Sequence, residues 1–582
     1  MNVTTSTLCL LIGANLIFFM QAGFAMMETG YTRAKNASNI ILKNLVNISV
    51  AIFVFWFLGF GLMFSGTGPV VGSLDLFASS DYSMNGSFSS AAFVLFQTLL
   101  CAVTAVIVVG AMAERTRFPA FMIYCAVISL IIYPVSGHWV WGGGWLSRLG
   151  FHDYAGSAVV HLVGGVAAFF GAKMIGPRIG KYTKEGHPRA IPGHNLTMGA
   201  LGVFILWFCW FGLTMAASVA TGGIASEDML GSLPSALVNT NLSAAAATLT
   251  AIVITWVRYK KPDISIIMNG TLAGLVAISS GADVVQPLGA VCIGILAAVV
   301  AVLGIEIVEQ KLQIDDPVGA SSVHGFCGGL GAILTGLFST NGGLFYGGGL
   351  KLLGVQLLGV AFIALWVTVI SYIALQAINN TVGLRISEKD EIQGLITEEH
   401  GTVKSYEEFM PTTGTLDTPA NPIPGADDQF LTFTKPIPVE EAVPVTNIPR
   451  TKPVRQSDGV KMTQITIITK ESKFEALKDA MDKIGITGMT VTQVMGCGFQ
   501  RGNPDETYRG VPLDMALLPK VKIDIVVCKV PPETVINTAK RILYTGHIGD
   551  GKIFVSDIEN VIKVRTGEEG YDALQDEVGE VF

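Results

Sequence analysis

The chain has 582 residues, half of them hydrophobic, and a mean hydropathy of +0.53, which is too apolar for an ordinary soluble protein. The charges are unevenly spread, since only 16 of the 38 Lys and Arg and 14 of the 45 Asp and Glu lie in residues 1–380. The sequence therefore predicts a bilayer region followed by a water-exposed region. The net charge of −7 argues against nucleic acid as a main partner. The eight cysteines form no CxxC pair and are interpreted as small buried residues.

Eleven apolar runs within residues 1–380 are long enough to span a bilayer. Of the 16 basic residues in this region, 14 lie in the connections after the odd-numbered runs or beside them, and only Arg148 and Lys351 lie on the other side. The positive-inside rule then predicts an N-terminus outside the cell and a cytoplasmic chain beyond residue 380. No Lys or Arg precedes Arg33, so residues 1–30 are interpreted as a retained first span and not as a signal peptide. The runs are 6–30, 38–65, 91–113, 118–136, 155–175, 197–219, 233–257, 264–281, 286–309, 322–340 and 351–378.

Two segments, Asp153–His161 and Asp316–His324, resemble each other. In each, an Asp lies eight residues before a His, a Gly lies five before it and a Val directly before it, and a Gly-Gly pair follows. The segments belong to the fifth and tenth runs, and an odd offset of five spans turns one half of the repeat upside down relative to the other. This pattern predicts a five-span inverted repeat whose working site lies at the interface between the halves.

The two repeated histidines, His161 and His324, lie inside predicted spans. A histidine in a span is costly and usually faces a cavity or a partner. Matching repeat positions predict that the two rings approach each other near the bilayer midplane, where paired neutral imidazoles could pass a proton or hydrogen-bond a small polar permeant. Simple hydrogen bonding of each ring across the helices remains the alternative.

A segment rich in Trp and Gly, 138–145, precedes the fifth span and contains Trp141. Such a segment is typical of an interfacial aromatic belt. Its three consecutive glycines also fit a shaped vestibule in which an indole face attracts a cation.

Six stretches of the first 400 residues together resemble the ammonium transporter (Amt/Mep/Rh) family. The resemblance implies a homotrimer in the inner (plasma) membrane, with one pore for ammonium or ammonia in each subunit. It places Trp141 in the outer ammonium-recruitment site, Asp153 as the buried support of that site, and His161 and His324 as the twin histidines of the pore. The stretch 383–401 resembles the family's cytoplasmic segment that couples subunits. The six stretches are 18–36, 110–118, 138–146, 153–161, 207–213 and 315–325.

The sequence departs from the family pattern at the outer end of the pore. The two phenylalanines that the family stacks below the recruitment site fall on Leu100 and Leu213, and the recruitment-site serine falls on Ala217, with Ser218 beside it. Leucine fills the volume but has no π-face for a cation. An ammonium-sensing receptor with little or no transport therefore remains the alternative function.

The polar part of the chain divides into three segments: a coupling segment at 381–407, a linker at 408–460 and a domain at 461–582. The linker contains nine prolines and shows no periodicity, which predicts an extended tether. The domain shows a βαββαβ order, which is typical of a ferredoxin-like α+β fold. Its predicted strands are 462–468, 489–495, 521–529 and 553–556, and its predicted helices are 471–484 and 532–543.

The segment 545–552 fits the G-x4-G-K part of a phosphate-binding loop, although Ile553 stands where that motif has a hydroxyl residue. A plain turn is the alternative. Lys563 and Arg565 follow closely and could meet phosphate charge. Because the hydroxyl residue is missing and no catalytic base is evident, an ATP-hydrolysing enzyme is not expected.

The domain resembles the PII nitrogen-signalling proteins in the stretches 485–502, 507–510, 518–527, 545–555 and 564–570. The resemblance implies a trimer that binds ATP or ADP between subunits, and 2-oxoglutarate beside Mg²⁺ and ATP. By position, Gln500 would hold Mg²⁺ and 2-oxoglutarate, Lys520 would pair with 2-oxoglutarate, and Arg509 would plug an ammonium pore from the cytoplasm. The loop tyrosine that some members have uridylylated falls on Leu513. The implied nucleotide-binding residues are Gly496, Gly498, Gly549, Asp550, Gly551, Lys552, Lys563 and Arg565.

Overall fold

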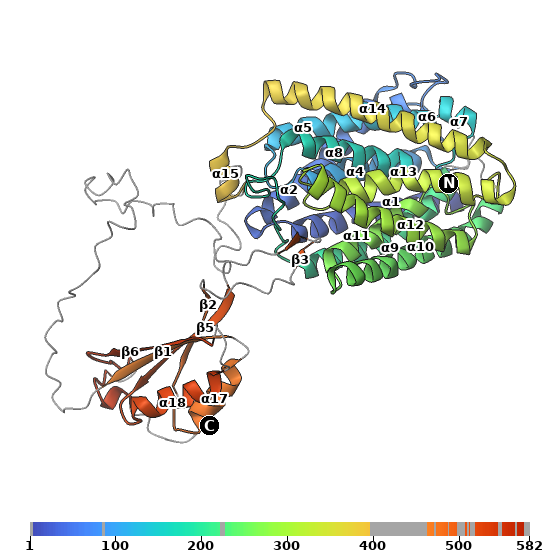
Figure 1. The fold of residues 1–582 in the computed structure, drawn as a ribbon. Helices are drawn as coiled ribbons and strands as arrows, with labels where there is room; N and C mark the ends of the chain where they lie inside the picture. Colours follow the sequence, from blue (N-terminus) through green and yellow to red (C-terminus); the bar gives the residue numbers. More distant parts are fainter. Residues whose placement is uncertain are drawn as a thin grey trace. The chain divides into compact units, whose positions relative to one another are not determined.

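The computed structural model divides into two compact units, a helical unit and a C-terminal unit, which are described separately (Figure 1). The predicted linker, 408–460, lies outside the described residues. Of the seven cysteines described, five are buried, in agreement with their interpretation as small core residues. The described residues are 4–83, 88–220, 227–395, 462–470, 473–486, 488–496, 507–508, 511–512, 518–544, 550–564 and 567–574.

Ten helices in the described part of the chain are long and apolar enough to cross a membrane, and each coincides with one of the predicted runs. Several are interrupted by π-helical turns, labelled η. The spans are α1 (Thr5–Tyr31); α2, η2 and α3 (Ala37–Val54, Phe55–Gly59, Phe60–Phe64); α4 (Ser90–Ala111); α5, η4, α6 and α7 (Phe118–Val127, Ile128–Ile132, Tyr133–Val140, Trp145–Leu149); η5 and α8 (Ser157–Leu162, Val163–Ile175); α9 (Leu196–Ala220); α10 (Glu227–Tyr259); α12 and η6 (Pro287–Glu306, Ile307–Lys311); η7 and α13 (Ser321–Phe326, Cys327–Phe338); and α14 (Lys351–Thr381).

The predicted run 264–281 behaves differently from the other ten. It forms α11 (Ile264–Ile278), which has only 15 residues. At about 1.5 Å per residue the helix extends for roughly 22 Å, less than the roughly 30 Å of a bilayer's hydrocarbon core. All but the first and fourth residues of α11 are buried against its neighbours. The described residues therefore contain ten candidate spans, and the eleven-span inverted topology stays a prediction.

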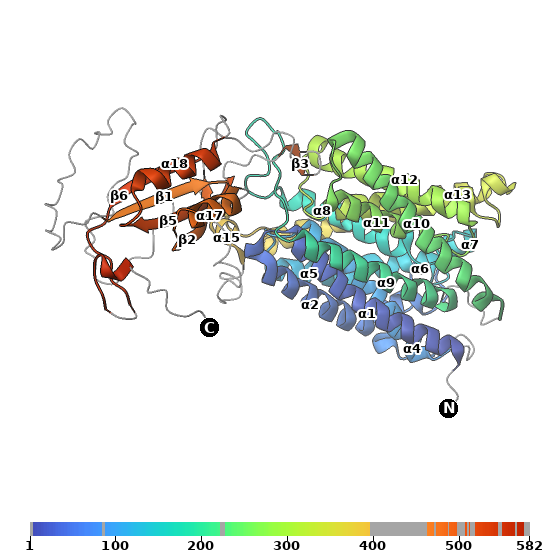
Figure 2. The same ribbon diagram turned by 90° about the horizontal axis from the view of Figure 1, so that it is seen from below.

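Small residues set the packing of the helical unit, most clearly between α1 and α9, which run side by side (Figures 1 and 2). A Cβ atom at Gly13 would lie 2.4 Å from the Cβ of Ala216, and one at Gly30 would lie 2.5 Å from the carbonyl oxygen of Asn195. Without these glycines the two backbones could not approach so closely, which is the usual way in which membrane helices associate.

The C-terminal unit has the predicted βαββαβ order: β1 (Thr463–Thr469), α17 (Phe474–Asp482), β2 (Thr490–Gly496), β5 (Leu518–Val527), α18 (Pro532–Leu543) and β6 (Lys552–Asp557). Its antiparallel sheet has the strand order β2-β5-β1-β6. Buried and partly buried residues alternate along β1, as expected for a strand with one covered face. Helices α17 and α18 cover that face (Figure 1). A separate short pair joins β3 (Thr507–Tyr508) to β4 (Val511–Pro512).

Candidate functional site

The structure brings the two repeated histidines into direct contact. His161 lies in η5 and His324 in η7, and their Nδ1 atoms are 3.2 Å apart, with stacked rings. Both side chains are buried. One Nδ1 must donate and the other accept, so the contact fixes complementary ring states. The Nε2 atom of His161 is also buried and has no hydrogen-bond partner among the described residues, which leaves it available to a ligand.

The indole of Trp210 holds the orientation of the pair. It stacks on His161 with ring centroids 5.1 Å apart and an angle of 16° between the planes. Its Nε1 donates to the hydroxyl of Ser279 at 2.9 Å, which fixes the indole in turn. Trp210 is not among the site residues predicted from the sequence. In the sequence, Trp210 is one tryptophan within an apolar run. Its position there does not predict that the indole stacks on His161.

Asp153 begins the turn that carries His161. Its Oδ2 accepts hydrogen bonds from the amides of Ala158 and Val159 at 2.9 and 2.8 Å, and its Oδ1 accepts one from the amide of Gly156 at 3.2 Å. Gly156 has φ +97°, a conformation that favours glycine. The carboxylate therefore satisfies amides that a helix start leaves without partners.

The turn that carries His324 is built in the same way. Oδ2 of Asp316 accepts from the amide of Ser321 at 2.8 Å, and Oδ1 accepts from the amide of Gly319 at 2.9 Å. Gly319 has φ +78°, matching the left-handed glycine of the first turn. The two histidines are thus presented by locally equivalent capped turns, as the repeated Asp-Gly-His spacing indicates.

The predicted recruitment-site residues lie around the first of these turns. The Nε1 of Trp141 donates to the backbone carbonyl of Asp153 at 2.7 Å. The hydroxyl of Ser218 donates to the carbonyl of Met215 in its own helix at 2.6 Å. Leu100 and Leu213 are both buried, and they belong to the same apolar core cluster as Trp210. The contacts therefore join Trp141 to Asp153 directly, whereas Ser218 bonds within α9.

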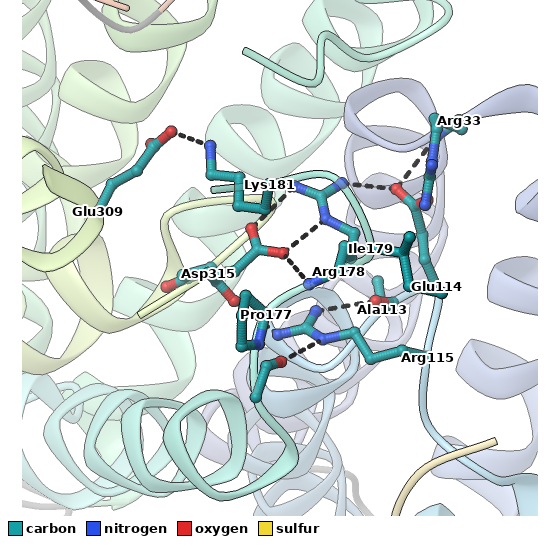
Figure 3. Close-up of polar contacts among 12 residues, drawn as sticks. Arg33, Ala113, Glu114, Arg115, Pro177, Arg178, Ile179, Lys181, Glu309 and Asp315 are labelled. Carbon is teal, nitrogen blue, oxygen red and sulfur yellow. Dashed lines mark hydrogen bonds and ion pairs between the residues drawn. The ribbon is translucent and has the colours of Figure 1, made fainter. Parts of the chain in front are cut away.

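A second polar site lies in the connections on the side rich in Lys and Arg (Figure 3). We call it the basic-end cluster; it comprises Arg33, Glu114, Arg115, Arg178 and Asp315. Arg178 donates to Asp315 through two nitrogens at 2.8 and 2.9 Å and to Glu114 at 2.7 Å, and Arg33 also pairs with Glu114. The fully buried Arg115 donates to three backbone carbonyls, one of them that of Asp315 at 2.6 Å.

Charge pairing outweighs burial at Glu114. Burial alone would raise the pKa of this carboxyl group, but the charges of Arg33 and Arg178 lower the pKa to about 2. Asp315 responds in the same way, since Arg178 and Arg115 hold its pKa well below the ordinary value against the effect of burial. Both carboxyl groups of the cluster are therefore ionised at neutral pH. Arg33, Glu114, Arg115 and Asp315 lie in stretches that carry the family resemblance, Arg178 does not, and no role was predicted for any of the five.

The described part of the predicted coupling segment packs beside this cluster. Arg385 pairs with Glu391 at 2.8 Å and donates to the carbonyl of Pro177 at 2.7 Å. Glu391, in α15 (Glu388–Gln393), accepts from the amide of Ile179 at 2.7 Å, and Lys35 donates to its carbonyl at 2.7 Å. The segment is thus tied to two connections of the helical unit.

In the C-terminal unit, two of the predicted ligand-binding residues are adjacent on neighbouring strands. A Cβ atom at Gly496, the end of β2, would lie 3.2 Å from Cγ of Lys520 in β5. Burial lowers the pKa of the Lys520 amine and the charge of Lys470 lowers it further. Two nearby amines raise the local positive potential, which fits a carboxylate or phosphate ligand.

The predicted phosphate-binding segment is described from Asp550 onward. Gly551 has φ +113°, and a Cβ atom there would lie 2.2 Å from the carbonyl oxygen of Ile468, so the position requires glycine. Lys552 begins β6, and Lys563 pairs with Glu568 at 3.7 Å. The glycine at 551 is therefore required by the adjacent strand β1, and the role of this segment in binding a nucleotide stays a prediction. Gly498, Gln500, Arg509, Gly549 and Arg565 lie outside the described residues.

Comparison with known proteins decides the family. Residues 8–405 match the model of the Ammonium Transporter Family. The chain belongs to the ammonium transporter family. Residues 462–568 match the model of Nitrogen regulatory protein P-II, so this transporter family member carries a fused P-II domain. The expected resemblances to both families are confirmed.

Individual relatives agree with this assignment. The chain is 39% identical over 426 residues to Ammonium transporter Amt2 of Archaeoglobus fulgidus, covering 69% of this chain and 88% of the relative. It is 36% identical over 422 residues to Ammonium transporter 1 member 3 of Solanum lycopersicum, covering 67% and 91%. Among solved structures, one called Sensor Amt Protein matches with a TM-score of 0.64 and 34% identity, covering 68% of this chain and 98% of that chain. Candida albicans Mep2 matches with a TM-score of 0.59 and 28% identity, covering 66% and 87%.

Proposed function

We propose that this ammonium transporter family member conducts ammonium or ammonia through a pore in each subunit of a homotrimer, with His161 and His324 in the lumen. The observation that carries the proposal is the 3.2 Å contact between their buried Nδ1 atoms, with an unpartnered Nε2 on His161. A buried chain of imidazoles can accept from or donate to a small nitrogen-containing permeant and can pass a proton. The N-terminus would lie outside the plasma membrane and the P-II domain in the cytoplasm, following the distribution of Lys and Arg.

Entry to this pore would pass the Trp141 side of the first capped turn. The indole is half-buried and held by the Asp153 carbonyl, so its ring is positioned to attract a cation. Ser218 would add a polar contact there. Leu100 and Leu213 would form the apolar constriction between this entry and the histidine pair.

The P-II domain would regulate the flux. Gly496, Gly551, Lys552 and Lys563 would hold ATP or ADP, together with Gly498, Gly549, Asp550 and Arg565. Lys520 and Gln500 would hold 2-oxoglutarate, with Gln500 also on Mg²⁺. The left-handed Gly551 and the two neighbouring amines at Lys520 and Lys470 support an anionic ligand at this end of the sheet.

A second candidate function, an ammonium-sensing receptor, is favoured by two observations. One structural relative is itself called a sensor. In addition, leucines occupy both positions at which the family places stacked phenylalanines. A receptor would bind ammonium and change the state of the P-II domain while passing little of it.

The test is ammonium flux into liposomes that contain the purified full-length protein. Replacing His161 or His324 with Ala should abolish the ammonium-dependent current or change its selectivity, with the trimer intact, because either change breaks the imidazole chain. His187→Ala, in an exposed connection, is the matched control and should keep wild-type flux. Wild-type flux and selectivity in both pore variants would overturn the relay. Absence of any current in the wild type would favour the receptor.

A further inference from the structure

At the end of the helical unit away from the basic-end cluster, one segment is fastened across another by its backbone carbonyls. This segment, 63–70, contains the end of α3 and part of the connection after it, and we call it the carbonyl strap. Three of its carbonyl oxygens accept hydrogen bonds from the Trp- and Gly-rich segment 138–145 and from α7. The pairs are Val70 with Nε1 of Trp139 at 2.8 Å, Pro69 with the amide of Trp145 at 2.9 Å, and Thr67 with the guanidinium of Arg148 at 2.7 Å.

Two further carbonyls of the strap meet both nitrogens of the His138 ring. Nδ1 lies 2.6 Å from the carbonyl oxygen of Met63, and Nε2 lies 2.7 Å from that of Gly68. A carbonyl oxygen can only accept a hydrogen bond, so each ring nitrogen must carry a proton. A neutral imidazole has one N–H group, and only the imidazolium ion has two. The residue is buried, which leaves the two carbonyls as the partners of the ring.

The surroundings of His138 favour a positive charge. His138 lies in the last turn of α6 and Met63 lies in the last turn of α3, so the ring stands at the C-terminal ends of two helices. The helix dipole makes both ends partly negative. Hydrogen bonds donated by a charged group are also roughly twice as strong as neutral ones. The charged side chains on the packed connections have other partners: Arg148 donates to Thr67 and Gly143, and Asp75 accepts from Ser79, Ser80 and Tyr82.

The run of three glycines in the segment 138–145 makes room for these contacts. A Cβ atom at Gly142 would lie 1.9 Å from the carbonyl oxygen of Met63 and 2.5 Å from Nδ1 of His138. A Cβ atom at Gly144 would lie 3.0 Å from the carbonyl oxygen of Pro69. A larger residue at position 142 would therefore push the strap away from the ring.

We propose that His138 is held as an imidazolium ion and that its two N–H groups fasten the carbonyl strap over the aromatic segment. His138 is then a positioning residue for Trp141, which lies three residues later on the same segment. Its proton is part of the structure of this face of the protein. In this respect it differs from the pair of His161 and His324, whose Nδ1–Nδ1 contact requires one nitrogen without a proton.

The charge is tested by solid-state NMR on the full-length protein in lipid, with ¹⁵N in the histidine rings. The spectra are recorded at about pH 8, where histidines in water are mostly neutral. The signal that His138→Gln removes should be that of a ring with both nitrogens protonated. The glutamine amide is neutral, and its single nitrogen cannot reach carbonyls on both sides of the ring. His187→Gln, which removes an exposed ring, is the matched control and should leave that signal in place.

An unprotonated nitrogen in the signal that His138→Gln removes, or a wild-type spectrum without any doubly protonated ring, overturns the imidazolium. If His138→Gln does not assemble, the wild type decides by itself. With ¹³C in the methionine carbonyls, the doubly protonated ring should couple to a carbonyl carbon, because Nδ1 lies 2.6 Å from the carbonyl oxygen of Met63. No such coupling at that ring also overturns the proposal.

The positioning role is measured separately, as ammonium flux into liposomes, and this part rests on the proposed function. His138→Gln should raise the half-saturating ammonium concentration several-fold with a smaller effect on the maximal current, because it frees the segment of Trp141 and leaves the histidine pair in place. An unchanged half-saturating concentration in this variant contradicts the positioning role. Absence of current in the wild type contradicts the transport function, and the NMR result then decides the charge of His138.

Discussion

At the scale of single residues, the histidine pair is held from three directions. Capped turns position both backbones, the Nδ1 atoms contact each other at 3.2 Å, and Trp210 stacks on the outer face of His161. Each restraint removes rotational freedom from a ring. A buried pair held this firmly keeps its hydrogen-bonding geometry without a ligand, which would lower the reorganisation needed if a permeant passes it as proposed.

Leu100 and Leu213 are expected to make the proposed constriction less selective for cations than paired aromatic residues would. Changing both to Phe should increase the preference for ammonium over neutral permeants, because an aromatic face attracts a cation and leucine does not. The measurement is methylammonium competition and ammonium current in liposomes. Both leucines are 1% exposed, so the added volume could cost about 1–3 kcal/mol of stability.

The matched control for this change is Leu100→Met with Leu213→Met, which nearly conserves volume and adds no aromatic face. It should leave selectivity unchanged. If the double Phe variant assembles and its competition and current equal those of the wild type, the identity of the residues at the constriction is unimportant in this protein.

At the scale of elements, the basic-end cluster joins connections that are distant in the sequence. Arg178 follows α8, Asp315 precedes η7 and Glu114 follows α4, yet the three side chains form one ionised network (Figure 3). A buried ion pair is weak evidence for stability by itself, but removing one partner leaves an uncompensated charge. The network therefore makes the mutual positions of these helices sensitive to the loss of a single carboxylate.

Glu114→Gln should lower the thermal stability of the purified protein strongly. Arg33 would lose its ionised partner and Arg178 would keep only Asp315, which leaves positive charge uncompensated at a cost of about 3–5 kcal/mol. Glu306→Gln is the control, because its partner Arg258 has a side chain 47% exposed and such pairs contribute no more than about 1 kcal/mol. Equal melting temperatures for Glu114→Gln and the wild type would contradict the role of the network.

The same carboxyl group sets a pH dependence. The pKa of Glu114 is lowered from 4.5 to about 2 in the folded protein. Its contribution to stability is therefore fully present above pH 4.5 and is lost as the pH falls towards about 2. The difference in melting temperature between the wild type and Glu114→Gln should shrink over this window. A difference that stays constant across it would show that ionisation of Glu114 does not stabilise the fold.

At the scale of the whole molecule, an ammonium transporter family region and a P-II domain are parts of one polypeptide. The predicted linker of about 50 residues would reach on the order of 40 Å, which keeps the domain near mM effective concentration at the pore. At that concentration, a domain with only weak affinity for the helical unit would still be docked for a substantial fraction of the time. Ligands can shift such docking only if they favour one state of the domain over another.

Arg509 is expected to plug the pore when the domain holds ADP, or nucleotide without 2-oxoglutarate, because its guanidinium repels a small cation and can bind carbonyls or carboxylates as a fork. Mg²⁺ and ATP with 2-oxoglutarate should retract the loop. Arg509→Ala should therefore give a flux that is insensitive to these ligands, with nucleotide binding intact. Lys483→Ala, an exposed cation of the same domain, is the control and should keep the response. Equal wild-type flux under both ligand conditions would contradict the plug.

The sequence alone determined the local and periodic features of this protein. Eleven apolar runs were predicted, and ten of them coincide with helices long and apolar enough to cross a membrane, because length and hydropathy are properties of consecutive residues. Alternation and turn residues predicted the βαββαβ order for the same reason. The repeated Asp-Gly-His spacing indicated that the two histidines belong together, since they occupy equivalent positions in the two halves of the repeat.

Only the tertiary structure decided which side chains meet when no repeat relates them. The stack of Trp210 on His161, the pairing of Arg178 with Asp315 across 137 residues, and the contacts of His138 with two backbone carbonyls depend on how each helix is rotated and shifted against its neighbours. Those rotations follow from close packing at glycines such as Gly13 and Gly30, which is a property of pairs of helices and not of one helix.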